Sequence, residues 1–132
     1  RIQFLDHAIQ VLGMEGIEAI HGRAEEISRT EDYREVYDVC VSRAVARLNT
    51  LCEYCLPFVK PGGHFVAMKA ELAKEELEEA GRAIDILGGR FKTMDSFTLP
   101  DGGERHLIVI DKVKPTPNKY PRGGGKPRKK PL

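Results

Sequence analysis

The sequence predicts an α/β fold in which a parallel sheet is finished by an antiparallel hairpin. Segments with a helical period alternate with short apolar segments along residues 1–87, which is typical of strands joined by crossover helices. Residues 37–42 and 64–69 are nearly continuous in apolar side chains, as strands covered on both faces of a parallel sheet are. Two further strand-like segments, 90–99 and 104–113, flank Pro100-Asp-Gly-Gly103, which is a hairpin signal.

The amino-terminal residues predict a helix and then a short strand. Glycine at 13 or 16 ends the helix, and its apolar stripe has helical spacing: Ile2, Leu5, Ile9 and Leu12. Because no capping residue precedes this helix and Arg1 is not methionine, we expect the chain to be the C-terminal piece of a longer protein. Residues 17–22 alternate apolar and polar side chains and predict a strand, followed by one helical turn over residues 23–28 and a charged loop.

Two longer helices are predicted on either side of the strand at 64–69. The first covers residues 47–59 and is ended by Lys60-Pro-Gly-Gly63. The second covers residues 71–87, with acidic residues in its first half, as the helix dipole favours. Its acidic run, 75–79, is expected to be solvated, and its buried stripe is expected to be Leu77, Ala80, Ile84 and Leu87.

The three cysteines, Cys40, Cys52 and Cys55, predict buried thiols in a reducing, cytoplasmic protein. Their odd number and apolar surroundings argue against a disulfide framework. Cys52 and Cys55 have metal-like spacing, but they lie in a helical pattern, and no second Cys or His pair stands at zinc-like spacing. We therefore expect no metal site. No run of about 18 apolar residues occurs, so we expect no membrane partner.

Charge divides the chain into an acidic body and a basic tail. Residues 112–132 hold eight of the 21 Lys and Arg residues and none of the 20 Asp and Glu residues. The body, residues 1–111, thus has 13 basic and 20 acidic residues, a net charge of −7, against +8 for the tail. The tail is rich in Pro and Gly, so we expect it to build no core of its own and to meet phosphates, with simple solubilisation as the alternative.

Several stretches together resemble one enzyme family. They are His21-Gly-Arg-Ala-Glu-Glu26, Tyr37-Asp-Val-Cys-Val-Ser-Arg-Ala-Val-Ala46, Phe65-Val-Ala-Met-Lys69, Gly103-Glu-Arg-His-Leu-Ile-Val-Ile110 and Pro115-Thr-Pro-Asn-Lys-Tyr-Pro-Arg122. The chain resembles the bacterial small-subunit ribosomal RNA guanine-N7 methyltransferases (RsmG, or GidB). The resemblance implies a class I, Rossmann-like methyltransferase sheet with a closing antiparallel hairpin, and S-adenosyl-L-methionine as cofactor.

One part of the family pattern is absent from this sequence. No Gly-rich loop follows a strand and precedes a helix, as a cofactor loop must. In the class I strand order, three-two-one-four-five-seven-six, residues 17–22 would be strand three and residues 37–42 strand four. We therefore expect the first two strands to be lacking and to be supplied by an N-terminal segment or by strand exchange with a second copy.

The resemblance also assigns roles to individual residues. It implies cofactor binding by Ala24, Glu25 and Arg43, and active-site or RNA contacts for Arg23, Lys69 and Arg105. Lys69 and Arg105 are candidates for positioning the reacting groups. In the tail, the candidates for RNA binding are Lys119, Arg122, Lys126, Arg128, Lys129 and Lys130. Tyr120, among them, could stack on a base or pack on the domain.

The predicted function is methyl transfer from S-adenosylmethionine to guanine N7 of 16S ribosomal RNA, free or in the small ribosomal subunit. Guanine N7 has a lone pair and no proton, so this reaction needs alignment of its reactants rather than a general base. The alternative is a truncated, non-catalytic RNA-binding fragment with an incomplete cofactor site. Another Rossmann-like enzyme, such as a dehydrogenase, is a weaker alternative, because it would need a G-x-G-x-x-G after a strand, and the sequence contains none.

Overall fold

Four strands form one mixed sheet. The computed structural model describes residues 1–43 and 46–132. The strands are β1 (Tyr37–Arg43), β2 (Val59–Lys69), β3 (Gly89–Thr98) and β4 (Glu104–Lys112), in the order β1-β2-β4-β3. β1 and β2 run parallel, and β4 is antiparallel to both β2 and β3. The predicted α/β class and closing hairpin are confirmed, and the order corresponds to strands four, five, seven and six of the class I sheet.

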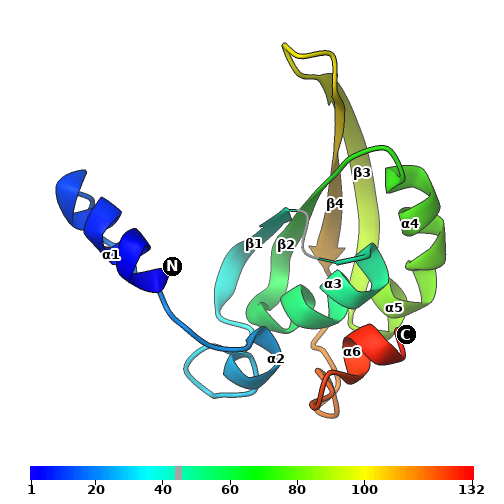
Figure 1. Ribbon diagram of the computed structural model, residues 1–132. Coiled ribbons are helices and arrows are strands. Elements are labelled where there is room, and N and C mark those ends of the chain that lie inside the picture. The colour runs from blue at the N-terminus through cyan, green and yellow to red at the C-terminus, as the bar shows by residue number, and fades with distance from the viewer. Residues whose placement is uncertain (44–45) are drawn as a thin grey trace.

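Helices cover one face of this sheet (Figure 1). α3 (Leu48–Cys55) continues into the 3-10 turn η1 (Leu56–Phe58) and packs beside α4 (Ala73–Glu79) and α5 (Gly81–Ile86). The single helix predicted over 71–87 is therefore two, since Gly81, a poor helix former, follows the break at Ala80. Among residues 1–43 and 46–132, no helix has the length and apolar character needed to cross a bilayer.

Strand β2 begins earlier than the sequence predicts. It starts at Val59 rather than at His64, so Lys60-Pro-Gly-Gly63 lies inside the strand instead of in a loop. The pairing of β2 with β4 begins only at His64. Pro61, which has no N–H to donate, is therefore tolerated because it stands outside that ladder.

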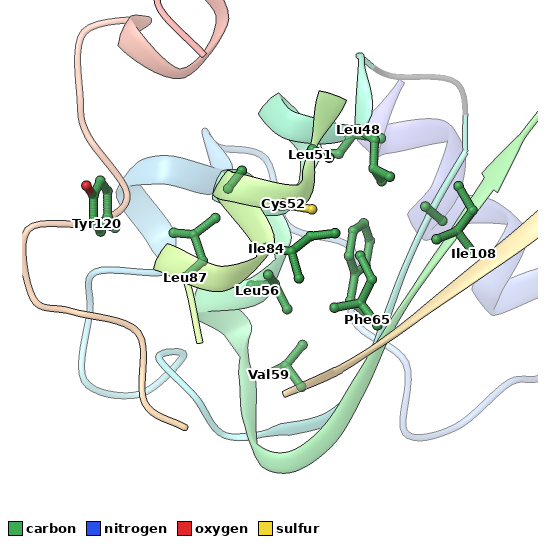
Figure 2. Close-up of a cluster of buried hydrophobic side chains, with 14 of the residues drawn as sticks. Leu48, Leu51, Cys52, Leu56, Val59, Phe65, Ile84, Leu87, Ile108 and Tyr120 are labelled. Atoms are coloured by element: carbon green, nitrogen blue, oxygen red, sulfur yellow. The ribbon is translucent and has the colours of Figure 1, made fainter. Parts of the chain in front are cut away.

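The core lies between the helices and the covered face of the sheet. Figure 2 shows Leu51 and Leu56 from the α3–η1 segment close to Phe65 of β2 and Ile84 of α5, and all four are buried. On β2 from Gly63 to Lys69, the residues facing the helices are buried, and those between them are half-buried. The predicted stripe of residues 71–87 is largely confirmed: Ala80, Ile84 and Leu87 are buried, and Leu77 packs partly buried against them.

The strand predicted for residues 17–22 is wrong. α1 (Ile2–Val11) is the expected helix, but none of its residues is buried, and Figure 1 shows it standing apart from the sheet. The residues after it form no strand, and β1 is an edge of the sheet. A strand without a neighbour has no partners for its backbone N–H and C=O groups, so an alternating pattern alone does not make a segment form a strand.

The second face of the sheet is open over β1. Val39 is 50% exposed and Val41 is 72% exposed, although both belong to the apolar run that predicts a sheet covered on both sides. The helices α3, α4 and α5 all lie on the opposite face (Figure 1). The prediction of two covered faces is thus wrong for the described residues. An apolar run shows that a strand can be buried on both faces, but it does not show that another element covers each face.

The basic tail packs against the domain. Tyr120 belongs to the buried cluster, and Pro127, in the short helix α6 (Lys126–Lys129), is also buried. Arg29 donates to the carbonyls of Asn118 and Pro121. A tail rich in proline offers many carbonyls and few N–H donors, and a guanidinium, with five N–H donors, satisfies several carbonyls at once.

Arg34 adds four hydrogen bonds of this kind. Its guanidinium donates to the carbonyls of Ser28, Thr116, Pro117 and Tyr120. The loop at 29–35, which overlaps the charged loop predicted at 30–36, therefore holds the tail. Of the two roles left open for Tyr120, the structure shows packing on the domain.

Lys112, the last residue of β4, is a buried cation. Its Nζ donates to the carbonyls of Leu56 (2.7 Å) and Val59 (2.8 Å) and lies 2.9 Å from Glu35 Oε2. Burial lowers the pKa of Lys112, while Glu35 opposes that shift. The same Glu35 oxygen accepts the N–H of Thr116 at 2.9 Å. The positive charge of Lys112 is therefore paired with Glu35 inside the protein and is unavailable to phosphate.

The cysteines differ in pKa in a way that a labelling experiment can detect. A hydrogen bond to Cys55 lowers the pKa of the Cys40 thiol, whereas complete burial raises the pKa of Cys52. The same hydrogen bond and burial raise the pKa of Cys55. Because the thiolate is the reactive form, we expect iodoacetamide to modify Cys40 first and Cys52 last in the native protein. Peptide mass spectrometry over a time course checks this order, and equal rates in urea are the control. Native labelling of Cys52 as fast as Cys40 would contradict it.

Candidate active-site cleft

A cleft opens beyond the carboxyl ends of β1 and β2. It has a volume of about 660 Å³ and brings together Arg43, Lys69 and Arg105, three of the residues singled out in the sequence. The remaining lining residues are Met68, Ala70, Glu76, Phe97 and Leu99. In an α/β sheet, ligands bind outside the carboxyl ends of parallel strands, so the position of the cleft is that of a ligand site.

Strand register explains why these side chains meet. Arg43 lies opposite Met68 across the parallel pair β1–β2, and Met68 lies opposite Leu107 across β2–β4. Arg105, two residues before Leu107, lies opposite Phe97 on β3. Residues directly opposite one another, and residues two apart on one strand, share a face of the sheet. Both arginines therefore lie on the face that the helices leave open.

Lys69 uses its charge inside the protein. Only 7% of its side chain is exposed; its Nζ donates to the Ala46 carbonyl and lies 3.0 Å from Glu76 Oε1. The same Glu76 oxygen accepts the N–H of Leu48 at 2.8 Å, at the start of α3. One carboxylate thus joins the end of β2, the start of α3 and α4 at the wall of the cleft.

Glu76 is the site residue that sequence reasoning missed. Its assignment to the solvated acidic face of residues 75–79 is wrong, because only 8% of the residue is exposed. A signal was present: Glu76 stands three residues after Ala73 and four before Ala80, both buried, so all three share one helix face. A charge within an apolar stripe predicts an internal partner.

A second, more exposed ion pair also joins the start of α3 to α4. Arg47 Nε lies 2.6 Å from Glu79 Oε1, and a second nitrogen donates to Oε2 at 3.1 Å. Glu79 raises the pKa of Arg47, and Arg47 lowers the pKa of Glu79. Ala44 and Val45, in the middle of the Ser-Arg-Ala-Val-Ala stretch, lie outside the described residues.

The two residues after Arg23 do not join the described lining of this cleft. Ala24 and Glu25 are the first residues of α2 (Ala24–Ile27), which lies near the start of β1, whereas Arg43 is at its end (Figure 1). Glu25 is buried, and its Oε1 lies 3.7 Å from Arg23, whose side chain is 69% exposed. The arrangement therefore separates Ala24 and Glu25 from Arg43.

Tail cations differ in their surroundings. Arg122 forms a multiple-contact pair with Glu53: its backbone N–H donates at 2.7 Å and its Nη2 at 2.8 Å. Glu53 is fully buried and raises the pKa of Arg122. The side chain of Lys119 lies over the Tyr120 ring, 5.3 Å from its centre. The remaining candidates are exposed on or beside α6: Lys126, Arg128, Lys129 and Lys130.

α6 is fixed to α3. The Thr50 hydroxyl donates to the Pro127 carbonyl at 3.0 Å, and both residues are buried. Figure 1 shows α6 on the helix-covered side of the molecule, so the exposed lysines on or beside α6 occupy that side. The cleft, in contrast, opens at the ends of the strands.

Comparison with solved structures finds the same fold in other proteins. M. jannaschii TYW2 in complex with AdoMet has a TM-score of 0.60 at 12% identity, with 85% of this chain and 53% of that chain covered. An rRNA methylase from Streptococcus thermophilus has a TM-score of 0.58 at 18% identity, with 83% and 65% covered. At these identities the likeness concerns the fold.

Sequence comparison is more specific. "Ribosomal RNA small subunit methyltransferase G" of Staphylococcus carnosus (strain TM300) is 51% identical over 134 residues, and the protein of that name from Lachnoclostridium phytofermentans is 53% identical over 133 residues. All of this chain is covered in both, but it spans only 56% and 55% of their lengths. The sequence model of the family described as "rRNA small subunit methyltransferase G" (GidB) matches residues 1–108. The chain therefore belongs to the GidB family of small-subunit ribosomal RNA methyltransferases.

Proposed function

We propose that the protein containing this segment transfers a methyl group from S-adenosyl-L-methionine to guanine N7 of 16S ribosomal RNA. The observation that carries the proposal is the cleft beyond β1 and β2, where Arg43 and Arg105 share one face of a methyltransferase-like sheet. Membership of the GidB family supports the RNA substrate. An rRNA substrate also favours a location in the cytoplasm, where ribosomes are assembled.

The cleft fits part of the cofactor. Its volume of about 660 Å³ is in the range of small-molecule sites, and its wall combines the Arg43 guanidinium with the apolar Met68 side chain. Arg43 would hold the cofactor by pairing with its carboxylate. Ala24 and Glu25 remain proposed cofactor residues from the family resemblance, although they lie apart from Arg43. When bound, S-adenosylmethionine supplies the methyl group on its sulfonium.

The residues of the chain contribute position and charge. Guanine N7 carries no proton, so the reaction needs no general base, and Glu76 of the lining can stay paired with Lys69. Arg105 can bind a phosphate or a base edge with its forked donors. Lys69, paired with Glu76, holds the wall of the cleft rather than reaching the RNA.

The test of this function is methylation of in vitro transcribed small-subunit RNA by a full-length protein carrying this segment. We expect 7-methylguanosine, detected by nucleoside mass spectrometry, only when S-adenosylmethionine is present. No methylation of either free RNA or reconstituted small subunits would refute the proposal.

An RNA-binding fragment is the second candidate, favoured by the 56% of its relatives' length that the chain spans. Calorimetric titration separates the two. The chain would be identified as such a fragment if the 132 residues bind RNA but not S-adenosylmethionine, while the full-length protein binds S-adenosylmethionine. Cofactor binding by the chain itself would exclude an incomplete site.

We further expect the α6 lysines to supply sequence-independent attraction for RNA. Removing residues 115–132 would also remove the buried Thr116 and Tyr120, so substitution is the cleaner test. Replacing Lys126, Lys129 and Lys130 by Gln should lower the slope of log affinity against log salt by about 2, because each phosphate contact contributes about 0.7 on single strands.

The control for this test is a triple Gln variant of the same net charge, at Lys60, Lys74 and Lys92. These exposed lysines lie on other elements, β2, α4 and β3. Filter binding over a salt series measures both slopes. Equal slopes for the two triple variants would mean that α6 makes no specific contribution.

A further inference from the structure

The cleft contains an exposed aromatic ring that packing does not explain. Phe97 is 39% exposed, although it stands near the end of a long strand. Figure 1 shows the β3–β4 hairpin projecting beyond the rest of the sheet. Phe97 lines the cleft together with Arg43 and Arg105, and ligand sites typically combine apolar or aromatic walls with a few polar groups.

We propose that Phe97 is the stacking surface for an unstacked purine base of RNA, with Arg105 beside it to hold the base edge or its phosphate. This inference rests on the proposed function and names the residue that positions the base. Phe97 and Arg105 are directly opposite one another in the antiparallel pair. Side chains at such positions lie about 4.5–5.5 Å apart at Cβ, close enough for one nucleotide to touch both.

The surroundings of the two side chains suit a nucleotide. Arg105 Nη1 donates to the Glu104 carbonyl at 2.8 Å, which holds its guanidinium along the strand. Met68 lines the same cleft, between Arg43 on the neighbouring strand and Arg105 on β4. Phe97 thus offers an aromatic face and the arginines offer donors, the combination by which proteins hold single-stranded bases.

The aromatic face also suits the product of the proposed reaction. A guanine methylated at N7 carries a positive charge, and the face of an aromatic ring attracts cations. Stacking on Phe97 would therefore become stronger as charge develops on the purine. Loss of the ring should lower the rate of methylation at saturating RNA as well as weaken RNA binding.

The absence of tryptophan from the sequence makes a direct test possible. Phe97→Trp places one fluorophore at the proposed surface, and Phe91→Trp places one elsewhere on β3. Phe91 is the matched control, because it is 43% exposed on the same strand but lines a separate groove beside α4 and α5.

The probes are a short oligouridylate carrying one guanosine and the same strand with an abasic site at that position. We expect the guanosine strand to quench the fluorescence of Phe97→Trp more than the abasic strand does, and neither to quench Phe91→Trp. We also expect Phe97→Leu to bind the guanosine strand about tenfold more weakly, with Phe91→Leu unchanged and Phe97→Trp retaining affinity.

Three outcomes would overturn the inference. Equal quenching at both positions would mean that the strand covers β3 without stacking at Phe97. RNA binding without quenching at position 97 would remove this stacking role and leave the proposed function standing. A failure of the unsubstituted chain to bind either strand would also end it, while methylation by the full-length protein would still decide the proposed function.

Discussion

Replacing Arg122 by Ala is expected to destabilise the protein by about 3 kcal/mol, because it leaves the buried carboxylate of Glu53 without its charged partner. Glu53 is fully buried, and its described partners are the Arg122 side chain and backbone N–H. Without the guanidinium, the Glu53 charge keeps only one strong donor, and the tail loses its attachment to α3. Urea unfolding followed by circular dichroism measures the loss.

Arg47→Ala is the control for that substitution. Arg47 makes a similar two-point contact with Glu79, but its side chain is 50% exposed, so solvent replaces the lost contact and the unfolding midpoint should hardly move. A double variant, Arg122→Met with Glu53→Leu, should recover much of the stability because no charge is left buried. Equal midpoints for Arg122→Ala and Arg47→Ala would refute the role given to the buried pair.

Arg43→Ala in the full-length protein is expected to lower RNA methylation by at least about 100-fold while the fold stays intact. The physical reason is position: a small displacement of a bound reactant costs about that factor. Arg43 is at the end of a strand and reaches the cleft without supporting the core. Initial rates of methyl transfer, with the cofactor affinity measured by calorimetry, check the prediction.

Two further variants make the result specific. Arg90→Ala removes an exposed arginine from β3, outside the described lining of the cleft, and should leave the rate unchanged. Arg43→Lys keeps the charge but loses the forked donor geometry, so it should recover only part of the activity. Full activity in Arg43→Ala would remove Arg43 from the site.

The parts of the fold that the sequence predicted correctly are those whose local pattern matches their tertiary surroundings. Residues 37–42 and 64–69 are apolar strands with paired neighbours, and the hairpin has its own turn chemistry. Residues 17–22 have an equally regular pattern but no neighbouring strand, and they form none. Strand formation depends on a partner, which a local pattern cannot supply.

Buried charges were harder to predict for a related reason. The partner of Glu53 is 69 positions away in the sequence, and the tail carbonyls that Arg34 binds are 82 to 86 positions away. Nothing near these residues in the sequence indicates such contacts. The cleft, in contrast, was partly predictable, because Arg43 and Lys69 stand at the ends of parallel strands, which meet at one edge of a sheet.

The attachment of the tail by Arg29 and Arg34 has a consequence for the order in which the protein folds. Residues 116–122 are synthesised long after residues 29–34, so the two guanidiniums have no tail carbonyls to bind while the body of the sheet is already emerging from the ribosome. Until then, the loop at 29–35 and the neighbouring edge strand lack their final support. The nascent chain should therefore expose the start of β1 to proteases or chaperones until residues 116–122 have left the ribosome.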